Sequence, residues 1–252
     1  MGMIKQSVTW GLARRAGADP AEAIRHVAEL GFVAIEMAPE EHWAAIRAAG
    51  LAIPIVSGHR SLGDGLNKPE NHDRIEAELR ASIRKAAANG IPSLITFSGN
   101  RNGLADDQGI QICAQGLRRV IRDAEEHGVN LCMELLNSKV NHPDYQCDHT
   151  AWGVRLCEAV GSPRCQLLYD IYHMQIMEGD LARTLENQLA AINHVQLADN
   201  PGRHEPGTGE INYRFLFEHL DRIGYQGWIG CEYKPATTTA AGLGWMKAHN
   251  SI

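Results

Sequence analysis

The sequence predicts an α/β protein built as a (β/α)8 barrel. Eight short apolar segments of strand character recur along the 252 residues, and helical segments alternate with them in a constant order. Such alternation is typical of a parallel sheet, and eight repeats in a chain of this length match the size of one barrel. No linker or change of composition divides the sequence, so we expect a single domain over residues 1–252. The alternative is an open α/β sheet, whose nucleotide-binding form is disfavoured because no G-x-G-x-x-G follows the first strand.

The first half of the chain contains four of the expected strands and three of the expected helices. The strands are expected over residues 6–10, 33–37, 53–56 and 93–97. The helix expected over residues 20–30 has Asp19 as its capping residue, Pro20 at its first position and Gly31 at its end, which are the usual helix boundary signals. The other two helices are expected over residues 40–49 and 72–89.

The second half repeats the same order with a clearer helical period. Apolar residues fall on one stripe of the segment 110–127, which predicts an amphipathic helix. Strands are then expected over residues 130–135, 166–169, 193–197 and 228–232. Helices are expected over residues 150–160, 181–189 and 213–223, with a last one that starts near residue 238.

Composition and charge narrow the classes of partner. The formal net charge is −6 and the basic residues are scattered, so we expect no nucleic-acid partner. No apolar run approaches the roughly 20 residues that span a membrane, and the first residues lack the layout of a signal peptide. None of the six cysteines forms a C-x-x-C pair, which argues against zinc-finger and thioredoxin-like sites. We therefore expect a cytoplasmic protein that acts on a small molecule, with a homo-oligomer expected by analogy only.

Polar residues at the ends of the later strands point to a metal site. Strand five delivers Glu134, strand six Asp170, strand seven Gln196 and strand eight Glu232. In a barrel these carboxyl ends form the active-site face. Three carboxylates gathered on apolar strands repel one another unless they are protonated, paired with cations or bound to a metal. Oxygen donors of this kind suit Mg²⁺, Mn²⁺, Co²⁺ or Zn²⁺.

Four further residues are candidates for substrate binding, and each also has a plainer interpretation. His173 lies three residues after Asp170, at the start of what we expect to be a loop, and it contacts a substrate oxygen, supports the site from behind or faces solvent. Arg203 lies in a Gly/Pro-rich loop and suits a substrate carboxylate, although a surface ion pair would also explain it. The other two candidates are His59, just after strand three, and Lys139, in the loop after Glu134.

The last third of the chain resembles the hydroxypyruvate isomerase family, within the xylose isomerase-like TIM barrel superfamily of sugar isomerases and epimerases. The resemblance lies in HVQLADNPGRHEPGTGEINY at residues 194–213, in GYQGWIGCEYKP at 224–235 and in GLGW at 242–245. The first two thirds resemble that family in layout only. Residues 57–60 and 137–145 differ from the hydroxypyruvate isomerase pattern.

The resemblance implies a divalent metal ion held by Glu134, Asp170, Gln196 and Glu232. It implies that Glu134 and Glu232 also act as the acid and base, and that His173 and Arg203 contact substrate oxygens. The implied reaction interconverts hydroxypyruvate and tartronate semialdehyde (2-hydroxy-3-oxopropanoate) by proton transfer through a cis-enediolate.

Other functions remain open at this point. The same metal site suits an isomerase or epimerase of a larger substrate, such as an oxo-tetronate or a keto-sugar, or an inosose-type dehydratase. A metal-dependent endonuclease is disfavoured by the acidic balance of the chain. A non-catalytic sugar-acid binding protein is disfavoured because all four expected ligands are present.

Overall fold

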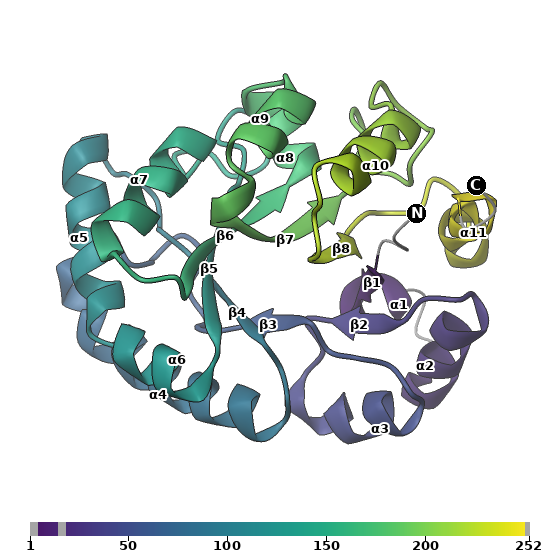
Figure 1. Ribbon diagram of the computed structural model, residues 1–252, viewed down its shortest axis with the longest axis horizontal. Coiled ribbons are helices and arrows are strands. Elements are labelled where there is room, and N and C mark those ends of the chain that lie inside the picture. The colour runs from purple at the N-terminus through teal and green to yellow at the C-terminus, as the bar shows by residue number, and fades with distance from the viewer. Residues whose placement is uncertain (1–4, 15–18, 250–252) are drawn as a thin grey trace. The chain divides into compact units, whose positions relative to one another are not determined.

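The computed structural model describes residues 5–14 and 19–249, and it consists of strands and helices in regular alternation (Figure 1). The chain divides into two compact units. Unit 1 comprises Met1–Pro54 and Val195–Ile252, and unit 2 comprises Ile55–His194. Among the described residues, no helix has both the length and the apolar character needed to cross a bilayer.

Unit 2 contains four complete parallel strands in the order β6-β5-β4-β3. Its elements are β3 (Ile55–Ser57), the 3-10 helix η2 (Pro69–Asn71), α4 (His72–Ala88), β4 (Ser93–Thr96), α5 (Asp106–Arg118), α6 (Ile121–His127), β5 (Asn130–Glu134), α7 (Thr150–Val160), β6 (Cys165–Asp170), α8 (Ile171–Met177), α9 (Leu181–Asn187), η3 (Leu189–Ala191) and the first residues of β7 (Ile192–Leu197). Helices α4 to α7 flank its strands in Figure 1.

Helices of unit 2 pack on its strands through small or apolar faces. Ile75, Leu79 and Ile83 of α4 recur every four residues and are fully buried, as expected for the inner stripe of an amphipathic helix. In α7 the residue at the contact is Gly153, where an added Cβ would lie 2.7 Å from Leu167 Cδ2 of β6. The glycine therefore allows α7 to approach β6 closely.

Unit 1 contains strands in the order β2-β1-β8-β7. Its elements are β1 (Lys5–Thr9), α1 (Trp10–Ala13), α2 (Pro20–Glu29), β2 (Ala34–Glu36), η1 (Glu40–His42), α3 (Trp43–Ala48), the end of β7, α10 (Tyr213–Arg222), β8 (Trp228–Cys231) and α11 (Thr239–His249). The capping role predicted for Asp19 is confirmed, because its Oδ1 accepts hydrogen bonds from the N–H groups of Ala21 and Glu22.

The structure differs from the predicted elements in three places. The helix expected over residues 110–127 is two helices, α5 and α6, with a break at Arg119 and Val120. Helix α8 directly follows β6 in a stretch that we expected to be a loop. The short helix α1 follows β1 and was not expected. The remaining strands and helices differ from the expected bounds by a few residues at their ends.

Candidate active site

Two of the expected metal ligands lie together in unit 2. Glu134 is the last residue of β5 and Asp170 the last residue of β6, and these strands pair in parallel with Glu134 opposite Leu168. Both side chains are buried, and a carboxylate oxygen of each lies within 4.8 Å of the other. Two buried carboxylates at this separation favour a proton or a cation between them. The pairing of β5 with β6 thus creates an acidic pair of the kind that binds a divalent metal.

His173 supports Asp170 directly. Asp170 caps α8 by accepting the backbone N–H of His173 at its Oδ1 (3.2 Å). The ring Nδ1 of His173 accepts the backbone N–H of Asn137 (3.1 Å), so the neutral imidazole carries its proton on Nε2. That Nε2 lies 3.5 Å from Asp170 Oδ2. The ring is therefore oriented from one side by Asn137 and directed from the other at a candidate metal ligand, an arrangement common behind metal sites.

Tyr145 links the ends of β4 and β5. Its hydroxyl accepts the N–H of Ser98 and donates to the carbonyl of Glu134, both at 3.1 Å. Burial raises the pKa of Tyr145, so the group stays a phenol that can donate. The backbone that carries Glu134 is thereby tied to the next strand of unit 2.

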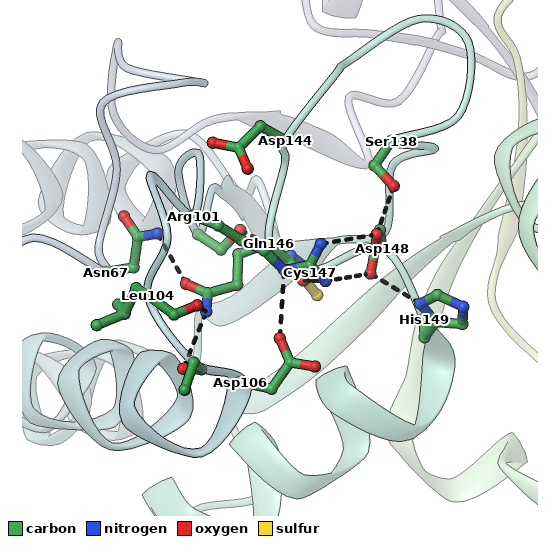
Figure 2. Close-up of polar contacts among 12 residues, drawn as sticks. Asn67, Arg101, Leu104, Asp106, Ser138, Asp144, Gln146, Cys147, Asp148 and His149 are labelled. Carbon is green, nitrogen blue, oxygen red and sulfur yellow. Dashed lines mark hydrogen bonds and ion pairs between the residues drawn. The ribbon is translucent and has the colours of Figure 1, made fainter.

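The loop after β5 is held against the loop after β4 by a polar network (Figure 2). Asp148 accepts hydrogen bonds from Arg101 Nη2 (2.8 Å), Ser138 Oγ (2.5 Å) and His149 Nδ1 (2.7 Å). Burial opposes ionisation of Asp148, but these hydrogen bonds outweigh it and hold the pKa of the carboxyl below its usual range. The backbone N–H of Arg101 also bonds to the carbonyl of Asp144 (2.7 Å). The loop is therefore fastened at several points along its length.

The side chains of Lys139 and His59 form hydrogen bonds with backbone groups. Lys139 Nζ donates to the carbonyls of Ile176 (3.0 Å) and Met177 (2.9 Å) at the end of α8. His59 Nε2 accepts the N–H of Phe97 (3.0 Å), and burial lowers the pKa of His59 to about 4. His59 is thus a neutral imidazole with its proton on Nδ1. Their expected contact with substrate stays a prediction.

Gln196 lies in unit 1, near the end of β7, and its side chain is fully buried. Its Nε2 donates to Oε1 of Glu36 (2.8 Å), at the end of β2. Its carbonyl oxygen Oε1 is buried and has no hydrogen-bonding partner among the described residues. Buried polar atoms without a partner are rare and need an explanation. A hard divalent cation would satisfy this oxygen, so the residue fits the predicted role of a metal ligand.

Glu232 and Arg203 form an ion pair in unit 1. Glu232 follows β8 directly, and its backbone N–H bonds to the carbonyl of Leu197 at the end of β7 (3.0 Å). Arg203 Nη2 donates to Glu232 Oε2 at 2.7 Å. Arg203 has a positive φ of 54°, a left-handed conformation that is uncommon for residues other than glycine. The loop therefore holds the backbone of Arg203 in a conformation that this residue type rarely adopts.

Asp199 organises the loop that carries Arg203. Its fully buried carboxylate accepts five backbone N–H groups at 2.8–3.1 Å, from Asn200, Gly207, Thr208, Gly209 and Ile211. Gly209 is required at its position, because an added Cβ would lie 2.2 Å from the carbonyl oxygen of Asn200. A single carboxylate thus fixes the turn after β7.

Two residues of this region were missed by the sequence analysis, Glu36 and Asp199. Glu36 ends β2 as Glu134 ends β5, so the same signal, a carboxylate at the end of an apolar strand, applies to it. Asp199 follows β7 and precedes Asn, Pro and Gly, which is a turn signal for a side chain that accepts from following N–H groups.

Comparisons with known families and structures agree with the predicted barrel fold. The sequence model of the family described as "Xylose isomerase-like TIM barrel" matches residues 10–249. A crystal structure of an AP endonuclease of family 2 from Brucella melitensis superposes with a TM-score of 0.86 and is 29% identical in sequence. That superposition covers 98% of this chain and 99% of the other. The predicted (β/α)8 barrel is confirmed.

Two curated relatives have names that state an activity. The chain is 38% identical over 179 residues to a protein of Escherichia coli K12 named hydroxypyruvate isomerase. That alignment covers 71% of this chain and 69% of the other protein. It is 44% identical over 126 residues to a protein of Cupriavidus necator named 2-oxo-tetronate isomerase. This second alignment covers 50% of this chain and 48% of that relative, about half the length of each.

Proposed function

The chain belongs to the xylose isomerase-like TIM barrel family, and we propose that it is a metal-dependent isomerase of a small 2-oxo acid. The relatives named hydroxypyruvate isomerase and 2-oxo-tetronate isomerase support this class of reaction. The observation that carries the proposal most directly is the buried pair of carboxylates, Glu134 and Asp170, within 4.8 Å of each other.

We assign the metal to Glu134, Asp170, Gln196 and Glu232, as the resemblance to hydroxypyruvate isomerases implies. All four offer oxygen atoms, which suit Mg²⁺, Mn²⁺, Co²⁺ or Zn²⁺. A divalent ion bound there would stabilise the negative charge that develops on the substrate oxygens during proton transfer. Oε1 of Gln196 has no hydrogen-bond partner in the part of the chain that the structure describes, which supports its assignment.

The proposed reaction moves one proton between neighbouring carbons. One of Glu134 and Glu232 removes the proton from C3 of hydroxypyruvate, and the electron pair of that C–H bond passes into the cis-enediolate. The other carboxyl group delivers a proton to C2, while the C3 hydroxyl proton moves to the C2 oxygen. The product, tartronate semialdehyde, has the same atoms as the substrate, so no oxidant or reductant is required.

Arg203 is the proposed partner of the substrate carboxylate. A guanidinium offers several N–H donors in a plane and matches a carboxylate better than an ammonium does. The loop held by Asp199 supports this role because it fixes the arginine beside Glu232. His173 acts from behind Asp170 in this proposal, since its ring nitrogens face Asn137 and Asp170.

A four-carbon substrate is the second candidate, and the relative named 2-oxo-tetronate isomerase favours it. In 2-oxo-tetronate the same proton moves from C3 to C2, and C3 carries a CH2OH group in place of one hydrogen of hydroxypyruvate. The chemistry required of the carboxylates is therefore identical. Only the space around C3 distinguishes the two substrates.

The experiment is proton NMR in D2O with the protein loaded with Mg²⁺ and either acid as substrate. We expect the substrate to convert to its isomer with deuterium at C2, and EDTA to abolish the conversion. The ratio of kcat/KM for the two acids then identifies the preferred substrate. A folded, metal-loaded protein that neither converts these acids nor exchanges their C3 protons with solvent would contradict the proposal.

A further inference from the structure

Glu36 occupies a position in which its carboxylate has defined partners on both oxygens. Its side chain is 0% exposed. Oε1 accepts Nε2 of Gln196 (2.8 Å), and Oε2 accepts Oγ of Ser7 (2.5 Å) on the neighbouring strand β1. Gly230 of β8 makes room for it, because an added Cβ there would lie 2.3 Å from Glu36 Oε1. Residues of β1, β7 and β8 therefore together determine where the carboxylate of Glu36 lies.

The arrangement selects one orientation of the Gln196 amide. A carboxylate only accepts hydrogen bonds, so it binds the NH2 end of the amide and excludes the carbonyl end. The Sδ atom of Met37 lies 3.6 Å from the same Nε2, and Met37 has a positive φ of 58°, which is uncommon for residues other than glycine. The NH2 end thus has acceptors, whereas no donor among the described residues bonds to the carbonyl oxygen.

We propose that Glu36 is a positioning residue that presents the carbonyl oxygen of Gln196 as a metal ligand. This inference rests on the proposed function, because it assumes that Gln196 binds the metal. An amide can rotate to offer either end, and only its oxygen is a ligand. Glu36 removes that ambiguity before the metal arrives, in the way that hydrogen-bonded acceptors orient metal-binding histidines.

The test measures Mn²⁺ affinity by electron paramagnetic resonance, in the full-length protein without substrate. Glu36→Met removes the acceptor and keeps an unbranched side chain of similar length. We expect its Kd for Mn²⁺ to rise about tenfold to 100-fold, the usual effect of losing such a supporting partner. Glu36→Gln removes the charge but keeps an acceptor for Gln196 and offers its NH2 group to Ser7. We expect it to restore affinity to within about threefold of the wild type.

The two variants separate positioning from charge. If Glu36→Gln and Glu36→Met weaken Mn²⁺ binding equally, the carboxylate acts by its charge and the inference is wrong. It is also wrong if a folded Glu36→Met binds Mn²⁺ as the wild type does. Ser7→Ala is the matched control, because it removes the hydrogen bond to Oε2 and leaves the one to Gln196, so near-normal affinity is expected.

A second measurement uses the wild-type protein and does not depend on any variant that must fold. The side-chain NH2 protons of Gln196, observed by ¹⁵N NMR in the metal-free protein, should exchange slowly with solvent, and one should be shifted by its hydrogen bond to Glu36. Rapid exchange, like that of an exposed glutamine, would overturn the inference. A wild-type protein that binds no divalent metal would overturn the proposed function as well, whereas intact wild-type binding with an unchanged Glu36→Met would remove only the role of Glu36.

Discussion

Arg203 donates to Glu232 at 2.7 Å, and the two side chains remain 27% and 25% exposed. A guanidinium in a planar fork can hold one carboxylate and still offer donors to another. The pair therefore joins a residue proposed to transfer a proton with a residue proposed to hold the substrate.

Arg203→Lys should lower kcat/KM by about 10- to 100-fold, mostly through a higher KM. Losing a hydrogen bond to a charged group costs about 1.5–3 kcal/mol, and an ammonium cannot reproduce the fork. Steady-state kinetics with hydroxypyruvate measure the effect. Arg214→Ala is the control, because Arg214 pairs with Glu218 on the exposed face of α10 and its loss should leave kinetics unchanged. Equal effects of the two substitutions would show that Arg203 has no particular role.

Glu134→Gln should lower kcat by about 10²- to 10⁴-fold, the usual contribution of a positioned acid or base. The amide keeps the size of the side chain but can neither accept nor deliver the proton. Conversion of hydroxypyruvate to its isomer, followed by NMR, measures the loss directly. Circular dichroism should show an unchanged fold. A Glu134→Gln protein that converts hydroxypyruvate at the normal rate would rule out the catalytic role.

Arg101→Met should reduce the free energy of unfolding by about 3 kcal/mol, because it leaves the buried Asp148 without its cationic partner. Urea unfolding measures the loss. Arg155→Met is the control, since Arg155 and Asp107 are 54% and 81% exposed and such surface pairs contribute at most about 1 kcal/mol. A similar loss in both variants would contradict the importance of the buried pair.

The ion pair between Arg101 and Asp148 also makes the free energy of unfolding depend on pH in the acidic range. The pKa of Asp148 is depressed in the folded state, so its contribution to stability is complete above the pKa of an unfolded aspartate. It is lost as pH falls through the lower, folded-state pKa. Arg101→Met should therefore flatten the acid side of the stability curve.

His59 should make the protein less stable as pH falls from about 6.5 to about 4. Its pKa is depressed in the folded state, so in this range the unfolded chain binds a proton that the folded chain does not. The difference corresponds to a loss on the order of 3 kcal/mol. His59→Gln supplies an acceptor for the N–H of Phe97 without a titrating ring, so its unfolding free energy should vary less over this range. Identical curves for wild type and variant would contradict this account.

Asp199→Asn should destabilise the loop after β7 and cost about 2–4 kcal/mol, because an NH2 group would face N–H donors that now bond to a carboxylate. Faster proteolysis within residues 200–210 and a lower midpoint of urea unfolding are the measurements. Asn200→Ala is the control, since its side chain makes an exposed contact with Glu210. A fully resistant Asp199→Asn loop would show that the carboxylate is dispensable.

Helix signals in the sequence were reliable where one local interaction decides the outcome. Asp19 and Pro20 predicted the start of α2, and the structure confirms the cap. The break between α5 and α6 escaped prediction because apolar residues on both sides of it, such as Leu117 and Ile121, are buried, so the apolar stripe continues across it. Helix α8 escaped because most of its residues are buried, and a helix without a polar face shows no period.

Polar residues at the strand ends predicted the candidate metal ligands, but not the residues that form hydrogen bonds with those ligands. Glu134 and Asp170 were expected at one end of neighbouring strands, and the structure places them within 4.8 Å of each other. Glu36 was overlooked although the strand expected over 33–37 places it one residue before its end, as the strand expected over 130–135 places Glu134. The tautomers of His173 and His59 depend on backbone N–H groups of Asn137 and Phe97, which are distant in sequence and cannot be inferred from it.

The hydrogen bonds of Asp199 have a consequence for how this part of the chain forms. All of its partners lie within the next twelve residues, between Asn200 and Ile211. Closing so short a loop has a small entropic cost, so the turn can form without waiting for contacts between distant segments. A circular permutant with new ends at residues 205 and 206 would lose this local closure. The segment 199–211 thus closes on itself through Asp199, while Arg203, His204 and Glu205 within it also bond to residues 232–236.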